Sequence, residues 1–209
     1  MQQNLNTPDK IFYLPGRGGQ LTAGLGQALL ERGLEVQGRE TRGEFNQLSF
    51  AQQVGLVASD LQAGFWDKRS HVIANSFGAY LFLHAQTMLP PNPGRVLLLS
   101  PIVGEFANEE TQTFFSPPYP KRLMEFATAK KFPSPRNAQI HVGELDWQSL
   151  PDNVEQFGLL TNIPVKVVPG AGHMLPKQYV ASVLDDWLSG RLPAVVSDQK
   201  QEPNEPEVF

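Results

Sequence analysis

The sequence contains no cysteine among its 209 residues. This absence excludes disulfide bonds, a thiolate nucleophile and cysteine-ligated metal sites. Basic residues are outnumbered by acidic ones, with 17 Lys and Arg and 21 Asp and Glu. The basic residues form no block along the sequence. A formal net charge of -4 gives no reason to expect a nucleic-acid partner.

Long apolar runs are missing as well, since none approaches the length of about 20 residues that spans a bilayer. The first residues, MQQNLNTPDK, carry neither the basic nor the apolar segment of a secretory signal. We therefore expect a cytoplasmic protein with no membrane partner. The length suggests a single domain over residues 1–190, and the polar, proline-bearing segment 191–209 is expected to be a disordered tail.

Short apolar runs alternate with longer segments of helical period, which is typical of βα units around a parallel sheet. Most of the runs are rich in Val, Ile and Leu on both faces, as a central strand covered by helices requires. The sequence thus predicts an α/β fold with about six parallel strands and helices on both faces. The expected strands are 10–16, 34–40, 71–76, 95–101, 139–145 and 165–170. The expected helices are 20–32, 49–66, 77–89, 120–131, 150–160 and 176–190.

One long irregular insertion, 103–138, separates the fourth expected strand from the fifth. It contains the segment TFFSPPYPKRLMEF and one expected helix. The insertion is too short to form a separate lid but long enough to line a pocket. We therefore expect a compact fold with no large cap domain.

The segment HVIANSFGAYLFLHA joins an expected strand to an expected helix at Ser76. A helix N-cap would by itself explain a serine at this turn. It would not explain Ala74 and Gly78, which are small enough to let a strand fold back into a helix without a clash. The pattern Ala74-Asn75-Ser76-Phe77-Gly78 is typical of a nucleophile elbow, with alanine in place of the first glycine.

A nucleophilic serine needs a base, and the chain offers four histidines. His71, His84 and His141 lie within expected strands or helices, and we interpret them as structural. His173 lies in the segment VVPGAGHMLP after the last strand, on a loop that leaves the same carboxyl edge of the sheet as the elbow. We therefore expect His173 to be the base.

A carboxylate must then orient this histidine and stabilise the imidazolium that forms during attack. Asp146 follows the fifth strand in the segment HVGELDWQSLP, again at the carboxyl edge. Its rivals are Glu144, within the expected strand, and Asp152, which would cap the next helix. The chain order Ser76, Asp146, His173 is one in which such triads occur.

Charge that develops on an attacked carbonyl oxygen needs rigid amide donors. The amide of Phe77, directly after the serine, supplies one. The second is expected from the segment YLPGRGGQL, where Gly16, Gly18 and Gly19 follow the first strand. We expect the Arg17 amide to be this second donor, with the Gly18 amide as the alternative.

With these motifs placed, residues 10–188 resemble the α/β-hydrolase fold family, because four motifs follow the appropriate strands in the family's order. The family often has a histidine where this chain has Pro15. We also expect no counterpart ahead of Lys10 for the two antiparallel strands that often begin the family's sheet. Within the family, the chain is similar to small bacterial carboxylesterases and acyl hydrolases with little or no lid.

The resemblance implies a serine hydrolase that cleaves a small-molecule carboxylic ester or thioester through an acyl-enzyme, with no metal or organic cofactor. In this scheme Ser76 attacks the carbonyl, His173 carries the proton and Asp146 holds the imidazole. Two other functions stay open at this point. The chain would be either a binding protein that keeps the fold without the chemistry, or an acyltransferase that uses the same triad.

The candidates for the substrate pocket lie beside the expected triad or in the insertion: Gly16, Gly18, Phe114, Phe115, Tyr119, Trp147 and Met174. The large side chains among them suggest an apolar acyl pocket, and completion of the core is the open alternative. Arg39 and Arg42 follow the second strand. They would either bind an anionic group of the substrate or belong to a solvated charged loop.

Overall fold

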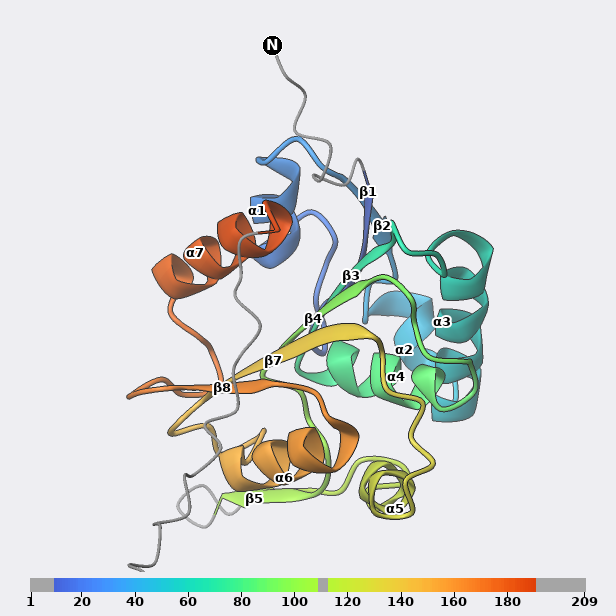
Figure 1. Cartoon of the computed structure of the whole chain (residues 1–209), viewed down its shortest axis with the longest axis vertical. Coiled ribbons are helices and arrows are strands. Elements are labelled where there is room, and N and C mark those ends of the chain that lie inside the picture. The colour runs from blue at the N-terminus through green and yellow to red at the C-terminus, as the bar shows by residue number, and fades with distance from the viewer. Residues whose placement is uncertain (1–9, 109–112, 191–209) are drawn as a thin grey trace, which may run out of the picture.

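Six parallel strands form the central sheet (Figure 1). The computed structural model describes residues 10–108 and 113–190, so the predicted tail 191–209 and the segment ahead of Lys10 lie outside the described residues. The strands lie in the order β2-β1-β3-β4-β7-β8, which confirms the predicted fold class. They are β1 (Lys10–Leu14), β2 (Glu35–Gly38), β3 (His71–Asn75), β4 (Arg95–Leu99), β7 (Asn137–Gly143) and β8 (Val165–Val168).

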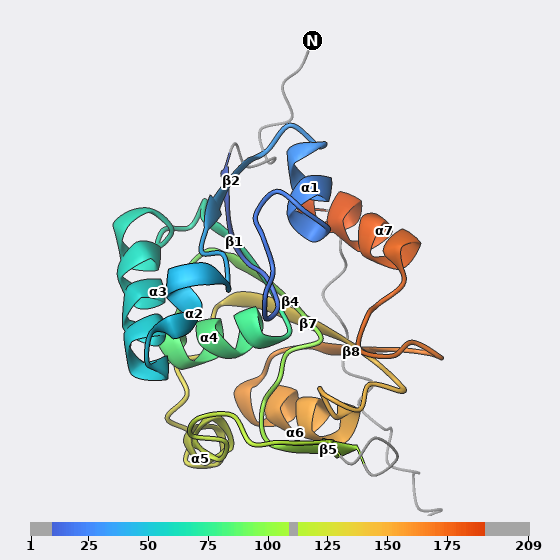
Figure 2. The ribbon, with the colours of Figure 1, turned by 180° about the vertical axis from the view of Figure 1, so that it is seen from behind.

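Helices cover both faces of this sheet. In Figures 1 and 2, α1 and α7 lie against one face, and α3, α4 and α6 lie against the other. Each predicted helix is present, and α2 is an additional short one. The helices are α1 (Leu25–Leu30), α2 (Gly43–Gln47), α3 (Phe50–Gly64), α4 (Phe77–Gln86), α5 (Arg122–Thr128), α6 (Pro151–Thr161) and α7 (Lys177–Leu188).

The insertion 103–138 contains more regular structure than the sequence predicted. It holds an antiparallel hairpin of β5 (Phe106–Asn108) and β6 (Thr113–Phe115) in addition to α5. Strands this short give too few alternations for a period-two pattern to be recognised. The ring of Phe106 packs against Trp147 at 5.5 Å between centroids, so the hairpin adjoins the loop after β7.

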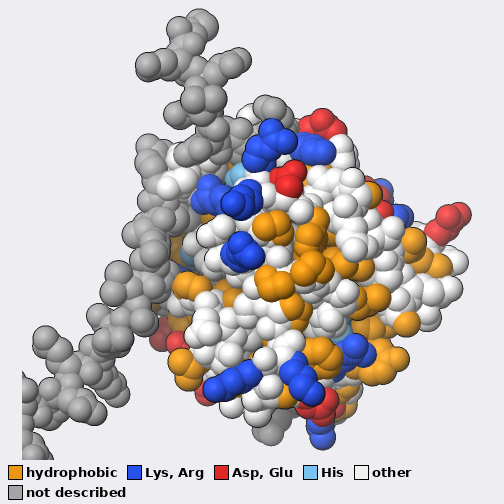
Figure 3. Space-filling model, turned by 45° about the vertical axis from the view of Figure 1, so that its right-hand side comes forward, with side chains coloured by type: hydrophobic (Ala, Val, Ile, Leu, Met, Phe, Trp, Pro, Cys, Tyr) orange, Lys and Arg blue, Asp and Glu red, His pale blue; other side chains and the backbone are white. Residues whose placement is uncertain are grey.

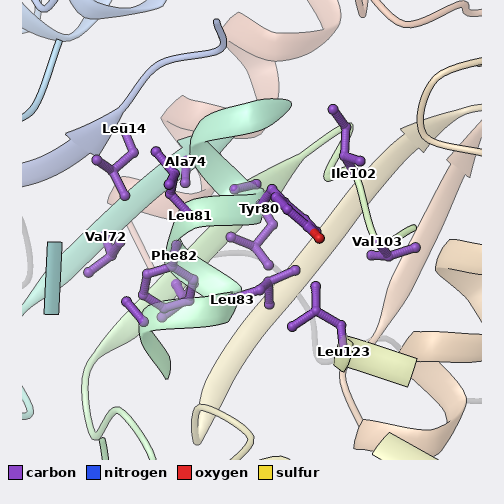
Figure 4. Close-up of a cluster of buried hydrophobic side chains, with 14 of the residues drawn as sticks. Leu14, Val72, Ala74, Tyr80, Leu81, Phe82, Leu83, Ile102, Val103 and Leu123 are labelled. Carbon is purple, nitrogen blue, oxygen red and sulfur yellow. The ribbon is translucent and has the colours of Figure 1, made fainter. Parts of the chain in front are cut away.

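The core consists of two apolar layers, one on each face of the sheet, because successive strand residues point to opposite faces. Leu14, Val72 and Ala74 pack with α4 on one face (Figure 4). Ile73 packs on the other face in the same cluster as Trp187 of α7. Every residue of α4 is buried, which explains why apolar side chains occur on all sides of this helix.

The surface carries charges of both signs. The face shown in Figure 3 has apolar side chains at its middle, with Lys and Arg above and below them. In the described part of the chain, no helix combines the length and the apolar character needed to cross a membrane. Within residues 10–108 and 113–190, no three His, Asp or Glu side chains are grouped so that they would hold a metal ion.

Candidate active site

Ser76 stands between β3 and α4 in a backbone conformation that residues with a side chain rarely adopt. Its φ is 52° and its ψ is -122°. Its amide donates to the Leu99 carbonyl of β4 at 2.9 Å, which ties the turn to the neighbouring strand. Although Ser76 holds the N-cap position of α4, its side chain makes no capping hydrogen bond to the described residues. Helix capping therefore does not account for this serine.

Gly78 and Ala74 permit this tight turn. A Cβ on Gly78 would collide with the carbonyl oxygens of Leu14 and Pro15, so α4 begins directly against the end of β1. Ala74 is fully buried and lies opposite Leu14 in the pairing of β1 with β3. The start of the helix and the glycine loop after β1 are thereby held next to each other.

His173 and Asp146 extend from Ser76 in one hydrogen-bonded chain. Ser76 Oγ lies 2.8 Å from His173 Nε2, and His173 Nδ1 lies 2.9 Å and 3.0 Å from the two carboxylate oxygens of Asp146. An ionised carboxylate can only accept, so Nδ1 carries the proton and Nε2 accepts from the serine hydroxyl. The structure thus brings together the three residues singled out in the sequence, arranged as nucleophile, base and orienting acid.

The carboxylate of Asp146 is removed from water. Its side chain is 0% exposed and that of His173 is 12% exposed. Oδ1 also accepts from the amides of Gln148 and Ser149 at 2.9 Å and 2.8 Å, which compensates for the lost hydration of the charge. These bonds fix the direction from which the carboxylate meets the imidazole.

The two rival carboxylates lie elsewhere. Glu144 is exposed, and its Oε2 accepts from the Gly170 amide at 2.7 Å. Asp152 lies in the first turn of α6, where a negative charge interacts favourably with the helix dipole. Among the described contacts, neither carboxylate reaches His173. Of the three carboxylates, Asp146 is therefore the one that contacts His173, and Glu144 instead holds the loop that carries the histidine.

The loops after β7 and β8 pack closely against each other. A Cβ on Gly143 would collide with the carbonyl oxygens of Ala171 and Gly172. The Leu145 amide donates to the Ala171 carbonyl at 2.8 Å. These contacts set the separation between the acid and the histidine. They could not be predicted from the sequence, because they join backbone atoms of two different loops.

The glycine loop after β1 lies beside the serine. A Cβ on Gly16 would lie 3.3 Å from the Cβ of Ser76. Thr41, a buried residue that the sequence reasoning missed, holds this loop: its hydroxyl donates to the Gly16 carbonyl, and its own carbonyl accepts from the Gly18 amide at 2.9 Å. The Gly18 amide therefore already has an acceptor within the protein.

The two arginines that follow β2 are paired with carboxylates. Arg39 forms a two-pronged ion pair with Asp60 of α3, with 2.9 Å between Nη2 and Oδ1. Arg42 Nε lies 2.7 Å from Glu40 Oε2. Both guanidinium groups thus have intramolecular partners and stabilise the loop between β2 and α3.

The large pocket candidates are spread around the site and differ in exposure. Trp147 is half-buried and packs against Phe106. Phe115 lies opposite Phe106 in the register of the hairpin, and its side chain is outside the described part of the structure. Three further candidates are largely exposed: Phe114, Tyr119 and Met174.

A row of aromatic rings runs from the elbow to the insertion. Phe50 is the first residue of α3. Its ring centroid lies 6.4 Å, 5.4 Å and 6.1 Å from the ring centroids of Phe77, Tyr80 and Tyr119, respectively. Tyr119 was predicted from the sequence as a pocket residue, whereas Phe50 and Tyr80 were not. The spacing of Tyr80, one helical turn after Ser76, was the available signal.

The other three histidines are buried in the core. His141 Nδ1 lies 2.6 Å from the Tyr179 hydroxyl. His84 packs edge-on against the ring of Tyr80 at 4.4 Å between centroids. His71 packs in the same way against Trp187, and its Nδ1 lies 2.8 Å from the Arg69 carbonyl.

Burial of His141 predicts a pH-dependent stability. Burial lowers its pKa to about 4, and the positive charge of Lys166 adds to this effect. An unfolded histidine titrates at about 6.5, so between these two values the unfolded chain binds a proton that the folded chain does not. His141 therefore reduces the free energy of unfolding as the pH falls through this window, by about 2–3 kcal/mol.

The test is urea unfolding of wild type and His141→Asn at pH 7 and at pH 4.5. Asparagine keeps an acceptor for Tyr179 but does not titrate. We expect the variant to lose about 2 kcal/mol less stability between the two pH values than wild type loses. Equal losses in the two proteins would contradict this prediction.

No protein-family model matches the sequence, and no curated protein matches it either. Solved structures match the fold over most of the chain. The ydeN gene product from B. subtilis has a TM-score of 0.60 at 14% identity, with 87% of this chain and 99% of that chain covered. The α/β-hydrolase enzyme MGS-MChE2, from the metagenome of lagoon sediments at Mar Chica, Morocco, has a TM-score of 0.56 at 20% identity, covering 88% and 92%.

A monoacylglycerol lipase from Paleococcus ferrophilus is a third match, with a TM-score of 0.58 at 12% identity, covering 90% of this chain and 97% of that one. The protein has the α/β-hydrolase fold, as its sequence resemblance predicted. At these identities the likeness establishes the fold, so the reaction must be argued from the site.

Proposed function

We propose that the protein is a serine hydrolase that cleaves carboxylic ester or thioester bonds of small molecules through an acyl-enzyme. The observation that carries this proposal is the hydrogen-bonded chain from Ser76 through His173 to Asp146. A serine hydroxyl is a poor nucleophile until a base takes its proton, and His173 Nε2 is in place to take it. The structural likeness to a monoacylglycerol lipase, whose substrate class is an ester, adds support.

In the acylation step, Ser76 Oγ bonds to the carbonyl carbon of the substrate while its proton passes to His173 Nε2. Asp146, hydrogen-bonded to Nδ1, stabilises the imidazolium that results. The carbonyl oxygen becomes an anion, which the amides of Phe77 and Arg17 stabilise. When the bond to the leaving oxygen or sulfur breaks, the leaving group takes the proton from Nε2.

The deacylation step repeats this sequence with water. His173 Nε2 takes a proton from a water molecule as the water oxygen bonds to the acyl carbon. The second tetrahedral intermediate expels Ser76 Oγ, which recovers its proton from Nε2, and the free acid leaves. This cycle uses no metal or organic cofactor.

We assign the acyl group an apolar character. The side chains of Trp147 and Met174 adjoin the acid and the histidine in the chain, and the aromatic row from Phe77 to Tyr119 begins at the elbow. Apolar and aromatic walls with a few polar groups are usual for sites that bind small molecules. We place this reaction in the cytoplasm, as the sequence predicts.

The proposal is tested by intact-mass analysis after exposure to a fluorophosphonate, which reacts with an activated serine whatever the natural acyl group is. We expect one adduct on wild type and none on Ser76→Ala. Ser116→Ala is the matched control, because its hydroxyl is exposed and donates to Glu105, so its loss should not affect labelling. A panel of esters and thioesters then identifies the preferred leaving group.

Ser76→Ala should also lose hydrolysis of every ester that wild type cleaves, down to a residual of about 10³–10⁴-fold over the uncatalysed rate at most. An adduct on folded Ser76→Ala, or no adduct on folded wild type, would overturn the proposed function. The second outcome would favour a binding protein built on the same fold.

A further inference from the structure

Asn75 directly precedes the serine, and the mechanism above gives its side chain no role. Its Oδ1 accepts a hydrogen bond from the hydroxyl of Tyr13 at 2.9 Å. Burial raises the pKa of Tyr13, so this hydroxyl stays protonated and acts as the donor. Because Oδ1 is held by Tyr13, the amide nitrogen Nδ2 must point away from it.

Nδ2 instead points toward the glycine loop. The point that a Cβ on Gly16 would occupy lies 3.2 Å from Asn75 Nδ2 and 3.6 Å from Ser76 Oγ. The amide nitrogen and the nucleophilic oxygen therefore flank the same glycine. This glycine directly precedes Arg17, whose amide is the second oxyanion donor in the proposed mechanism.

Within the described residues, Asn75 Nδ2 has no hydrogen-bond acceptor, although Asn75 is half-buried. Because Tyr13 already occupies the oxygen of this amide, its N–H groups are available to a ligand that binds beside the glycine loop. The serine oxygen, which attacks the substrate in the proposed mechanism, flanks the same glycine. The carbonyl oxygen of a substrate bonded to that atom becomes an anion next to the same loop.

We propose that Asn75 is a catalytic residue whose Nδ2 donates a third hydrogen bond to the oxyanion, alongside the amides of Phe77 and Arg17. Tyr13 is the positioning residue, because its hydroxyl fixes which end of the amide faces the site. This inference rests on the proposed function, since it requires attack by Ser76. The three donors come from three elements: the end of β3, the start of α4 and the loop after β1.

A side-chain donor to an oxyanion has a measurable signature. Removal of one such donor typically lowers the rate by about 10²–10³-fold, because its bond strengthens as charge develops. Asn75→Ala removes the donor. Tyr13→Phe keeps the donor and the buried ring but removes the hydroxyl that orients it. Comparison of the two variants therefore distinguishes a hydrogen bond from Asn75 to the substrate from a purely structural hydrogen bond between Asn75 and Tyr13.

The experiment measures the second-order rate constant for fluorophosphonate labelling in wild type, Asn75→Ala, Tyr13→Phe and the double variant, with the melting temperature of each. Attack on phosphorus also places negative charge on an oxygen in the oxyanion site. We expect labelling of Asn75→Ala to be slower than wild type by about 10²-fold or more. Tyr13→Phe should be slowed by about 10-fold or less, and the double variant should match Asn75→Ala.

A purely structural role of Asn75 would give a different result. If the only role of Asn75 were to bond Tyr13, both single variants and the double variant would be slowed equally and would lose similar thermal stability. That outcome would overturn the inference, as would labelling of Asn75→Ala at the wild-type rate. In both cases wild type would still be labelled at Ser76. Failure of the proposed function is distinct, because then wild type itself would not be labelled.

Discussion

Replacement of Asp146 with asparagine is expected to slow acylation of Ser76 by about 10⁴-fold. Both carboxylate oxygens of Asp146 lie within hydrogen-bond distance of His173 Nδ1, and the side chain is 0% exposed. An amide at this position presents either a donor to Nδ1 or a neutral acceptor. The first favours the wrong tautomer of His173, and the second stabilises the imidazolium less well. The rate of ester hydrolysis and the rate of fluorophosphonate labelling both measure this loss.

Two other variants serve as controls for this prediction. Asp152→Asn changes a carboxylate in the first turn of α6 that does not contact the histidine, and its activity should stay close to wild type. Glu144→Gln keeps an oxygen that can accept from the Gly170 amide, so its loss should be small. If either control lost more activity than Asp146→Asn, the acid would have to be reassigned.

Of all the variants considered, Gly78→Ala is expected to show the largest decrease in the free energy of unfolding. The added Cβ would collide with the carbonyl oxygens of Leu14 and Pro15, which are backbone atoms with little freedom to move. Either α4 moves away from β1 or the glycine loop shifts. Overpacking of this kind costs about 3 kcal/mol in the free energy of unfolding. Urea unfolding measures that cost, and labelling of Ser76 should slow as well, because the oxyanion donors move apart.

Gly55→Ala is the matched control for this prediction. Gly55 lies inside α3, and a Cβ there would meet nothing within 4 Å. Alanine is favoured over glycine in a helix by about 0.5–1 kcal/mol, so this variant should be more stable than wild type. If Gly78→Ala were as stable as Gly55→Ala, the close approach of α4 to β1 would be wrong.

The strands could be predicted because their Val, Ile and Leu runs are bounded by glycine and proline. Helix ends were harder to place. The helix predicted over 20–32 is shorter in the structure, where α1 begins at Leu25 after Gly24 with a φ of 56°. A helix as short as α2 and strands as short as β5 and β6 contain less than two periods of any pattern. Their formation depends on contacts with neighbouring elements.

The site could be predicted for those residues whose position is set by the end of a single strand. Ser76, Asp146 and His173 each stand just beyond the carboxyl end of a strand, and parallel strands bring those ends to one edge. The supporting residues could not be predicted. Thr41 and Asn75 act through contacts with loops that are distant in the sequence, and neither residue type nor spacing marks those contacts.

The triad also divides the chain into two halves. Ser76 lies 97 residues before His173, and the pairing of β4 with β7, across the insertion 103–138, completes the sheet between them. A chain that has folded only up to β4 holds the serine in an elbow but has no base to take its proton. Chemical reactivity of Ser76 therefore reports completion of the whole sheet. During refolding, a reagent that labels this serine would therefore measure the fraction of fully folded molecules and would leave partly folded ones unlabelled.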